Sequence, residues 1–371
     1  MATHKIRFLD LRVQQQEKRA VYIRLINDIL ENGPIVSGTY VKELEKVIAA
    51  HCKRKHAFAV NSGTSALYIS LKSLGIKRND EVIIPCISWI ATANVVNLIG
   101  ATPVFADVRD DLNICSSSIE ALINKNTKAI IAVDFTGRVF ETKKIQSICN
   151  KYGISLIEDA AQAFGAKRDQ KPAGSFGLIS CFSMNSVKIL SGFGEAGMIL
   201  TNDDKLAAKF SYLRESGMID RLDCVEPSMN FRMDTIQAAM ILEKYKDIES
   251  VISLRRKNAS FYDKYLSKFV TCPTEAIYEH NVYYTYTILT RKRDELKLFL
   301  EQKGIETQIQ HNKLMCEHPA YKKNMKHDQN SKELVKKILS IPIHEKLSLE
   351  QICFVKDQII DFFEQTGDNY E

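Results

Sequence analysis

Residues 57–106 read AFAVNSGTSALYISLKSLGIKRNDEVIIPCISWIATANVVNLIGATPVFA, and they alternate short apolar runs with helical patterns. The runs are rich in β-branched and aromatic residues and are bounded by polar residues or glycine, which is typical of buried strands. We expect strands at Ala57–Val60, Glu81–Ile84 and Pro103–Ala106, with helices over Thr64–Leu74 and from about Ile90. This alternation favours a mostly parallel sheet that is covered by helices on both faces.

The same alternation continues as far as residue 200. We expect further strands at Ala129–Val133, Ser155–Ile157, Ser180–Ser183 and Gly197–Leu200, a helix over Thr142–Tyr152, and two earlier helices over Glu17–Leu30 and Val41–Ala50. The fold class is therefore α/β, with three layers. Sheets of this kind collect ligands at the carboxyl ends of their strands, so polar residues at those positions are the first candidates for a site.

A length of 371 residues with 45% hydrophobic content favours two domains. We predict a large domain over residues 1–247 and a smaller C-terminal α+β domain over 248–371, with the helices in residues 17–50 packing on the small domain. A helical pattern from Met233 to Tyr265 bridges the two. Further along we expect a strand at Tyr283–Leu289, helices at Arg293–Lys303 and Phe354–Phe363, and an exposed charge-rich loop leading into a helix at Tyr321–Lys337.

Composition narrows the class of protein. The nine cysteines contain no Cys-x-x-Cys pair and the eight histidines no metal-binding spacing, so we predict neither a disulfide framework nor a metal. The apolar run Cys86–Phe105 is broken by polar residues and predicts a helix plus a strand, not a membrane span. The N-terminus lacks the apolar core of a signal peptide, which predicts a cytoplasmic protein. A net charge of +6, spread along the chain, suits phosphorylated small molecules better than nucleic acid.

Two strand ends carry the first candidate residues. In Asn61–Ser65, Gly63 permits a tight turn, and Thr64 and Ser65 begin a helix whose unpaired amides favour an anion. Plain helix capping by serine or threonine is the alternative. Lys188 follows the strand at Ser180–Ser183 and precedes a glycine-rich turn, where its amine is suited to chemistry. The alternative for a lysine is a solvated surface charge.

A third strand end carries Asp159 and Gln162. The carboxylate suits a protonated ring nitrogen, and Gln162, one helical turn on, suits the phenolic oxygen of the same ring. The alternative is a capping box, in which Asp159 caps a helix and Gln162 reaches back to it. Trp89 is the only tryptophan, and it either stacks on the ring or is a core aromatic residue.

An amine, a partner for pyridinium and an anion site are the parts that pyridoxal phosphate requires. With these residues in place, the chain resembles the DegT/DnrJ/EryC1/StrS family of sugar aminotransferases, which have the fold type I of the aspartate aminotransferase superfamily. The motifs that carry the resemblance over nearly the whole chain are Phe8–Leu11, Asn61–Leu67, Gly100–Phe105, Glu158–Gln162, Lys188, Gly194–Gly197 and Asn230–Ala239.

The resemblance implies a role for each site residue. Lys188 would bind pyridoxal 5'-phosphate covalently and shuttle a proton, Asp159 would pair with the pyridinium, and Gln162 would meet the phenolic oxygen. The remaining cofactor residues would be Ser62, Gly63, Thr64, Ser65, Trp89 and Ser183, together with Asn230, which in this family reaches the cofactor phosphate of the neighbouring subunit. A homodimer with shared active sites follows from this resemblance.

The family also implies a ping-pong transamination. L-glutamate would leave its nitrogen on the cofactor as pyridoxamine 5'-phosphate, and a nucleotide-linked ketosugar would take it, for a bacterial surface glycan such as lipopolysaccharide or a related aminosugar. The substrate candidates are Arg232, Gln310 and His311. Residues 184–187, 135–137 and 310–312 depart from the family pattern, which puts the substrate in question more than the reaction.

The opening Phe8–Leu11 and the block Glu158–Gln162 favour a 3-keto over a 4-keto sugar. Alternative acceptors are a keto-cyclitol or a sugar phosphate. A related sugar dehydratase is a further alternative, although such enzymes usually carry histidine in place of the lysine, and Lys188 argues against it. A non-catalytic regulator that binds the same cofactor is the alternative from another class of protein.

Overall fold

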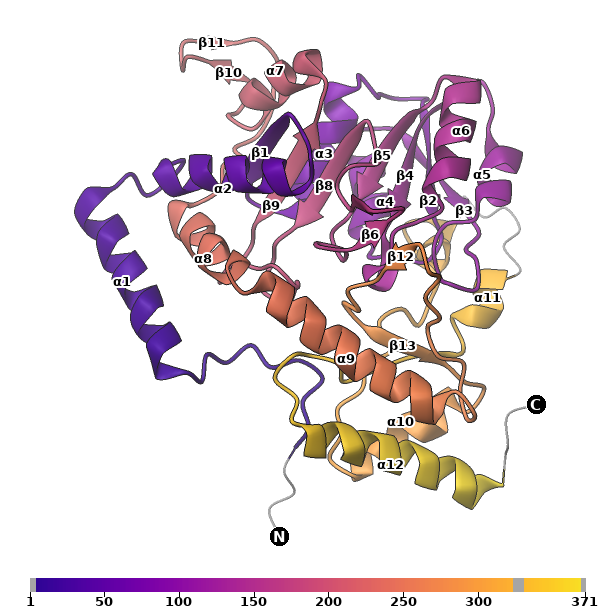
Figure 1. The fold of residues 1–371 in the computed structure, drawn as a ribbon. Coiled ribbons are helices and arrows are strands. Elements are labelled where there is room, and N and C mark those ends of the chain that lie inside the picture. The colour runs from indigo at the N-terminus through magenta and orange to yellow at the C-terminus, as the bar shows by residue number, and fades with distance from the viewer. Residues whose placement is uncertain (1–4, 323–329, 368–371) are drawn as a thin grey trace.

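A computed structural model describes residues 5–322 and 330–367 and contains a central seven-stranded sheet (Figure 1). The strand order is β1-β9-β8-β5-β4-β2-β3, and only β9 runs antiparallel to its neighbours within this sheet. The strands are β1 (His56–Val60), β2 (Glu81–Pro85), β3 (Thr102–Ala106), β4 (Thr127–Val133), β5 (Ser155–Asp159), β8 (Ile179–Ser183) and β9 (Gly197–Thr201). The expected mostly parallel sheet is confirmed.

Helices cover both faces of this sheet because its strands are apolar on both sides. Along β2, Ile83 enters one core cluster, while Val82 and Ile84 enter the other. The first face is covered by α2 (Thr39–His51), α5 (Ser116–Leu122), α6 (Thr142–Tyr152) and α8 (Thr235–Tyr245). The second is covered by α3 (Gly63–Ser73), α4 (Ala91–Leu98) and α7 (Asp204–Leu213).

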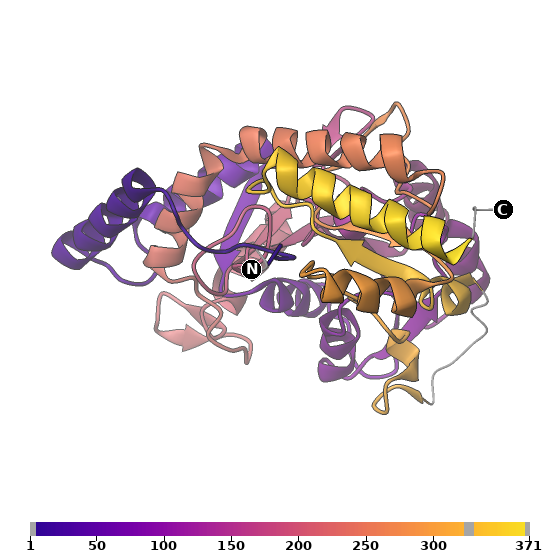
Figure 2. The ribbon, with the colours of Figure 1, turned by 90° about the horizontal axis from the view of Figure 1, so that it is seen from below.

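The C-terminal part has its own apolar cluster. The elements of this C-terminal part are α9 (Ile248–Leu266), β13 (Tyr286–Leu289), α10 (Arg293–Gln302), α11 (Asn330–Leu334), β14 (Ile338–Ile341) and α12 (Leu349–Thr366). Figure 2 shows α9, α12 and α10 lying beside one another over the β13–β14 pair. Ile6 joins this cluster and pairs with Ile305, so the start of the chain lies against its C-terminal part.

Short two-residue strands complete the structure. They are β6 (Lys167–Arg168), β7 (Lys171–Pro172) and β12 (Glu279–His280) in one small sheet, and β10 (Met218–Ile219) with β11 (Asp223–Cys224) in a projecting hairpin (Figure 1). Among the described residues, no helix is long and apolar enough to span a membrane. Within the same residues, no three His, Cys, Asp or Glu side chains form a group that could hold a metal ion.

Two expectations need correction, and a third lies partly outside the described residues. The helix predicted over Met233–Tyr265 is interrupted at Asp247, which leaves helical geometry (φ −103°, ψ 1°) while its carboxylate pairs with Lys18 of α1 (Gln16–Asn32). The strand predicted from Tyr283 begins only at Tyr286, because Tyr283 has a φ of 49°. The predicted loop leading into a helix at Tyr321–Lys337 falls partly on residues 323–329, which lie outside the described residues, and the helix within it is α11.

The N-terminal helices also lie elsewhere than expected. Both α1 and α2 contact α8, and α2 contacts β1 as well. The buried face of α2, which includes Leu44 and Ile48, belongs to the core cluster of the large sheet. The helices therefore pack on the large sheet and α8, because the apolar stripe of α2 finds its partners there. The contact with the C-terminal cluster comes instead from the segment around Ile6.

Candidate active site

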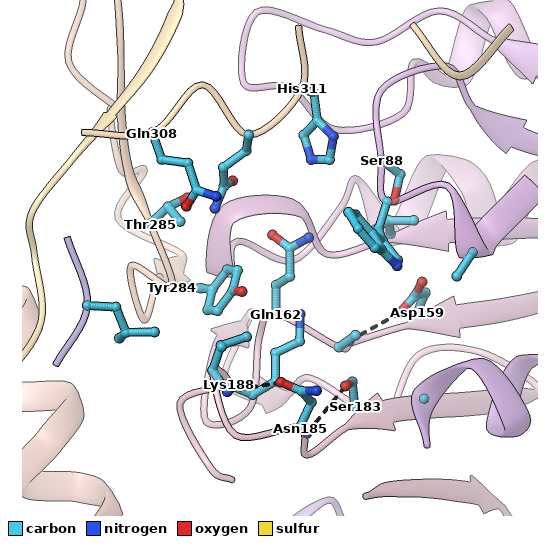
Figure 3. A pocket seen from close by; sticks show the side chains of 18 of the residues that line it. Ser88, Asp159, Gln162, Ser183, Asn185, Lys188, Tyr284, Thr285, Gln308 and His311 are labelled. Atoms are coloured by element: carbon cyan, nitrogen blue, oxygen red, sulfur yellow. Dashed lines mark hydrogen bonds between the residues drawn. The ribbon is translucent and has the colours of Figure 1, made fainter. Parts of the chain in front are cut away.

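A cavity of about 850 Å³ lies at the carboxyl ends of β5 and β8, and the C-terminal part closes its other side (Figure 3). Its walls combine residues from three parts of the chain. The large sheet contributes Ser62, Gly63, Thr64, Ser88, Trp89, Asp159, Gln162, Ser183, Asn185, Lys188 and Glu195; the C-terminal part contributes Tyr284, Thr285, Gln308, Gln310 and His311; and the N-terminal segment contributes Phe8 and Leu9. All three predicted strand-end sites therefore meet in one place.

The start of α3 forms one end of the cavity. Ser62 caps this helix by accepting a hydrogen bond from the Ser65 N–H at 3.1 Å. Gly63 lies against β8 so closely that a Cβ there would be 2.7 Å from the Cβ of Ser183. Only glycine allows this approach, which brings Thr64 and Ser183 together beside a helix N-terminus. Hydroxyls and unpaired amides of this kind favour a phosphate group.

Ser65 is not part of this wall. It is buried, and its hydroxyl donates to Asn61 Oδ1 at 2.6 Å. In the first turn of α3 the Ser65 hydroxyl also lies 2.8 Å from Ser62 Oγ, so its side chain points back to the residues that cap the helix. Capping, which was the alternative for this segment, therefore accounts for Ser65, while Ser62 both caps the helix and lines the cavity with Gly63 and Thr64.

Asp159 ends β5 and is almost fully buried. Burial raises the pKa of its carboxyl from 3.8 to about 6, although the Ala161 N–H and the charge of Lys188 oppose the shift. The Ala161 N–H lies 3.2 Å from Oδ1. A cationic N–H brought into the cavity would reverse this rise by stabilising the carboxylate. The environment of Asp159 therefore suits a protonated ring nitrogen.

Gln162 reaches the cavity from a turn and not from a helix. Residues 160–166 form consecutive turns, in which the Ala163 N–H donates to the carbonyl of Ala160. The predicted capping box and the helical spacing from Asp159 are therefore wrong, because the chain leaves β5 without entering a helix. The Gln162 Oε1 accepts the Thr136 N–H at 2.8 Å. That bond leaves the amide N–H groups as the donors available to a ligand oxygen.

Lys188 stands in the loop between β8 and β9. Its N–H donates to the Asn185 carbonyl at 2.8 Å, and the loop is closed by a bond from Met184 N–H to the Ala196 carbonyl at 2.7 Å. Its Nζ lies 4.6 Å from the centre of the Tyr284 ring, within range of a cation–π contact. Figure 3 shows Lys188 below Gln162, beside Asn185 and Tyr284.

Trp89 and His311 line other parts of the wall. Trp89 is 66% exposed, which excludes the core alternative and leaves its ring accessible from the cavity. The His311 ring lies 5.3 Å from that of Phe135, and burial, with the nearby charge of Lys188, lowers its pKa to about 4. The imidazole is therefore neutral at pH 7.

Asn230 and Arg232 do not line this cavity. Arg232 Nε donates to Asn230 Oδ1 at 3.0 Å on the outside of the molecule, ahead of α8. Close by in sequence, Leu222, Val225 and Met229 are more than half exposed, at 81%, 52% and 54%. Any ligand contact of Asn230 or Arg232 would therefore have to be made outside their own chain's cavity.

Several wall residues were missed in the sequence. Tyr284, Thr285 and Gln308 come from the C-terminal part, and only its docking against the sheet places them near Lys188. Thr136 lies in a segment that departs from the family pattern, and nothing in the sequence indicates its hydrogen bond to Gln162. Thr136 has a positive φ of 59°, and a sequence gives no sign of this backbone conformation when the residue is not glycine.

Comparison with known proteins gives a consistent result. Residues 16–360 match the sequence model of the DegT/DnrJ/EryC1/StrS aminotransferase family. The "Pleiotropic regulatory protein" of Geobacillus stearothermophilus is 33% identical over 96% of this chain and 98% of its own. The "UDP-2-acetamido-2-deoxy-3-oxo-D-glucuronate aminotransferase" of Pseudomonas aeruginosa is 33% identical over 94% and 98%. The "UDP-4-amino-4,6-dideoxy-N-acetyl-beta-L-altrosamine transaminase" of Campylobacter jejuni is 32% identical over 94% and 96%.

Solved structures agree with this. The chain is similar to S. venezuelae DesV "in complex with ketimine intermediate", with 29% identity, coverage of 97% and 99%, and a TM-score of 0.93. It is also similar to ntda of Bacillus subtilis "with bound cofactor pmp", with 26% identity, coverage of 97% and 86%, and a TM-score of 0.91. The expected pyridoxal phosphate fold type I is thereby confirmed.

Proposed function

Because this chain belongs to the DegT/DnrJ/EryC1/StrS aminotransferase family, we propose that it moves the amino group of L-glutamate to a nucleotide-linked ketosugar, preferring a 3-keto to a 4-keto sugar. It is a pyridoxal-phosphate-dependent sugar aminotransferase. The donor, the sugar and the position of its ketone are what we propose. The observation that carries the proposal is the meeting of Lys188, Asp159, Gln162 and the start of α3 in one cavity.

The residues present fit the cofactor. Bound pyridoxal phosphate supplies a carbonyl carbon that exchanges nitrogen and a ring that withdraws electrons. The buried carboxyl of Asp159 would pair as a carboxylate with the protonated ring nitrogen, because that cation would offset the burial that raises its pKa. Gln162 would donate through its amide to the phenolic oxygen, since its carbonyl already accepts the Thr136 N–H. Gly63 and Thr64 would hold the phosphate with Ser183, and Trp89 would cover a ring face, since all four line the cavity.

Lys188 is the acid and base of the reaction. Lys188 is the only lysine among the described residues that line the cavity. The Tyr284 ring, 4.6 Å from Nζ, keeps the amine beside the cavity when it is not bonded, so that it can move a proton at the substrate carbon. His311 is neutral and does not compete as a cation.

The acceptor is supported by the other wall of the cavity. Gln308, Gln310 and Thr285 offer amide and hydroxyl groups suited to sugar hydroxyls. A cavity of about 850 Å³ has room for a sugar beside the cofactor. The Pseudomonas relative named for a 3-oxo sugar supports the 3-keto preference, and the Campylobacter relative named for a 4-amino sugar supports the alternative. A keto-cyclitol or a sugar phosphate is the second kind of acceptor.

A homodimer is part of the proposal. Asn230 and Arg232 lie on the outside of their own chain, a few residues after the exposed apolar side chains of Leu222 and Val225. A second copy seated there would receive the amide and the guanidinium at its own cavity. We also propose that the chain is cytoplasmic, that it serves a surface glycan such as lipopolysaccharide, and that its domains divide at 247/248, in the short break between α8 and α9.

The test screens 3-keto and 4-keto nucleotide sugars, inososes and sugar phosphates with L-glutamate, measuring 2-oxoglutarate and locating the new amine by NMR. Release of 2-oxoglutarate with a 3-keto nucleotide sugar above all others is expected. Lys188→Ala should abolish turnover and the borohydride-reducible cofactor linkage. The matched control is Lys209→Ala, whose Nζ donates to the Ser73 carbonyl away from the cavity and should leave both intact. If none of the ketones is turned over although the borohydride-reducible linkage is present, the result would favour a non-catalytic regulator.

A further inference from the structure

Two carboxyl groups, those of Asp134 and Glu158, lie fully buried directly behind the cavity. Asp134 follows β4 and Glu158 precedes Asp159 in β5, and the two strands pair in register so that Val133 lies opposite Asp159. The N–H of Asp134 donates to the Asp159 carbonyl at 2.9 Å. The side chains of Asp134 and Glu158 come within hydrogen-bonding reach of each other. Two acidic groups in contact inside a core require one proton between them.

The surrounding donors show which group is ionised. Glu158 Oε1 accepts the Gly174 N–H at 2.7 Å, and its Oε2 accepts the Phe176 N–H at 2.8 Å and the Ser180 hydroxyl at 2.6 Å. An acceptor with so many donors is a carboxylate. Arg54 adds a nearby positive charge, since its Nη2 donates to the same Ser180 Oγ at 2.9 Å.

Asp134 has the opposite surroundings. Its Oδ1 accepts the Phe140 N–H at 3.1 Å, while among the described residues no N–H or O–H group donates to Oδ2. Burial, followed by the charge of Glu158, raises the pKa of Asp134 well above its usual value, and the Asp159 charge acts in the same direction. The proton between the two groups therefore belongs on Asp134 Oδ2, where it can be donated to Glu158.

The loop that Asp134 holds carries two contacts of the active site. It runs from Phe135 to Phe140, and the Phe140 N–H is bound by Asp134 itself. Inside it, Thr136 donates its N–H to Gln162, and the Gly137 carbonyl accepts the Val282 N–H at 3.0 Å. A Cβ at Gly137 would lie 2.7 Å from the backbone nitrogen of Tyr284, so this loop seats the tyrosine that meets Lys188.

We propose that Asp134 is a positioning residue of this enzyme: as a neutral acid it donates a hydrogen bond to Glu158, and it thereby fixes the loop 135–140 that orients Gln162 and Tyr284. The significance of those two residues rests on the proposed function. The protonation of Asp134 and the rigidity of the loop do not, and both can be measured without a ketosugar.

The test compares wild type with Asp134→Asn and Asp134→Leu, each loaded with pyridoxal phosphate. Infrared difference spectra of wild type against Asp134→Asn should contain the carbonyl stretch of a protonated carboxylic acid at neutral pH. Asparagine keeps a donor for Glu158 and an acceptor for Phe140, so kcat/KM should stay within about threefold. Leucine removes both, and kcat/KM should fall by about tenfold or more, with faster exchange of the Thr136 amide hydrogen and altered cofactor absorption.

Three results would overturn the proposal. They are a wild-type spectrum without the carboxylic acid band, an asparagine variant as impaired as the leucine variant, and a folded leucine variant with wild-type absorption and amide exchange. If the leucine variant does not fold, Asp134→Ser takes its place, because serine is too short to reach both partners. A protein with the acid band and the slow amide, yet without turnover, would count against the proposed function alone.

Discussion

Replacing Asp159 by asparagine should stabilise the cofactor-free protein while it weakens the cofactor site. Burial raises the pKa of the folded carboxyl from 3.8 to about 6, so the unfolded chain loses its proton first as the pH rises. Ionisation therefore favours the unfolded state. Since a pKa difference of one corresponds to about 1.4 kcal/mol, the free energy of unfolding falls by about 3 kcal/mol once both states are ionised. Asparagine removes this cost.

The assay is urea unfolding of the cofactor-free wild type and Asp159→Asn over a range of pH. The difference between their free energies of unfolding should be smallest at acid pH, grow between the usual pKa and about 6, and then level off. Asp204→Asn is the control with the opposite sign, because Lys55 and His56 lower the pKa of that exposed carboxyl. An Asp159→Asn protein less stable than wild type at neutral pH would refute the reasoning, and so would a difference independent of pH.

Two further changes test the site. Gly63→Ala should weaken pyridoxal phosphate binding by about tenfold, since its Cβ would lie 2.7 Å from that of Ser183, whereas Gly75→Ala, strained by a φ of 73° in open space, should lose only stability. Equal cofactor affinity in the two variants, measured by fluorescence titration, would contradict this. Mixing inactive Lys188→Ala with Arg232→Ala should restore about a quarter of wild-type turnover if a symmetric dimer shares its sites. No recovery after subunit exchange, confirmed by mass spectrometry, would mean that Arg232 serves no partner.

The parts of the fold that could be predicted are those with local signals. The strands at 57–60, 81–84 and 180–183 are short apolar runs between polar residues, and each lies within a strand of the structure. Asp159 and Lys188 could be found because parallel strands end at the same edge of a sheet. Predicting that they meet in one cavity required no knowledge of contacts between distant parts of the chain.

The parts that could not be predicted depend on long-range packing. Tyr284 and Gln308 reach Lys188 only because the C-terminal part docks on the sheet, and no local pattern reports that docking. The turns after Asp159 were predicted as a helix because Asp-x-x-Gln also reads as a capping box. The break before α9 coincides with an ion pair between Asp247 and Lys18, which are far apart in the sequence, so no local pattern reports it.

Because β9 is antiparallel to β8, the loop that carries Lys188 begins and ends at the same edge of the sheet. Residues 184–196 leave β8 and return beside it, and their ends are held by the pairing of Ser183 with Gly197. Inside the loop, the Ser186 N–H donates to the Gly194 carbonyl and the Gly192 N–H to the Met184 carbonyl. The loop thus has internal hydrogen bonds, with further ones to Gln237 and Lys244 of α8, and it could be exchanged between relatives together with those two partners. Transplanting it would carry the unusual residues 184–187 into another scaffold and leave the parallel strands untouched.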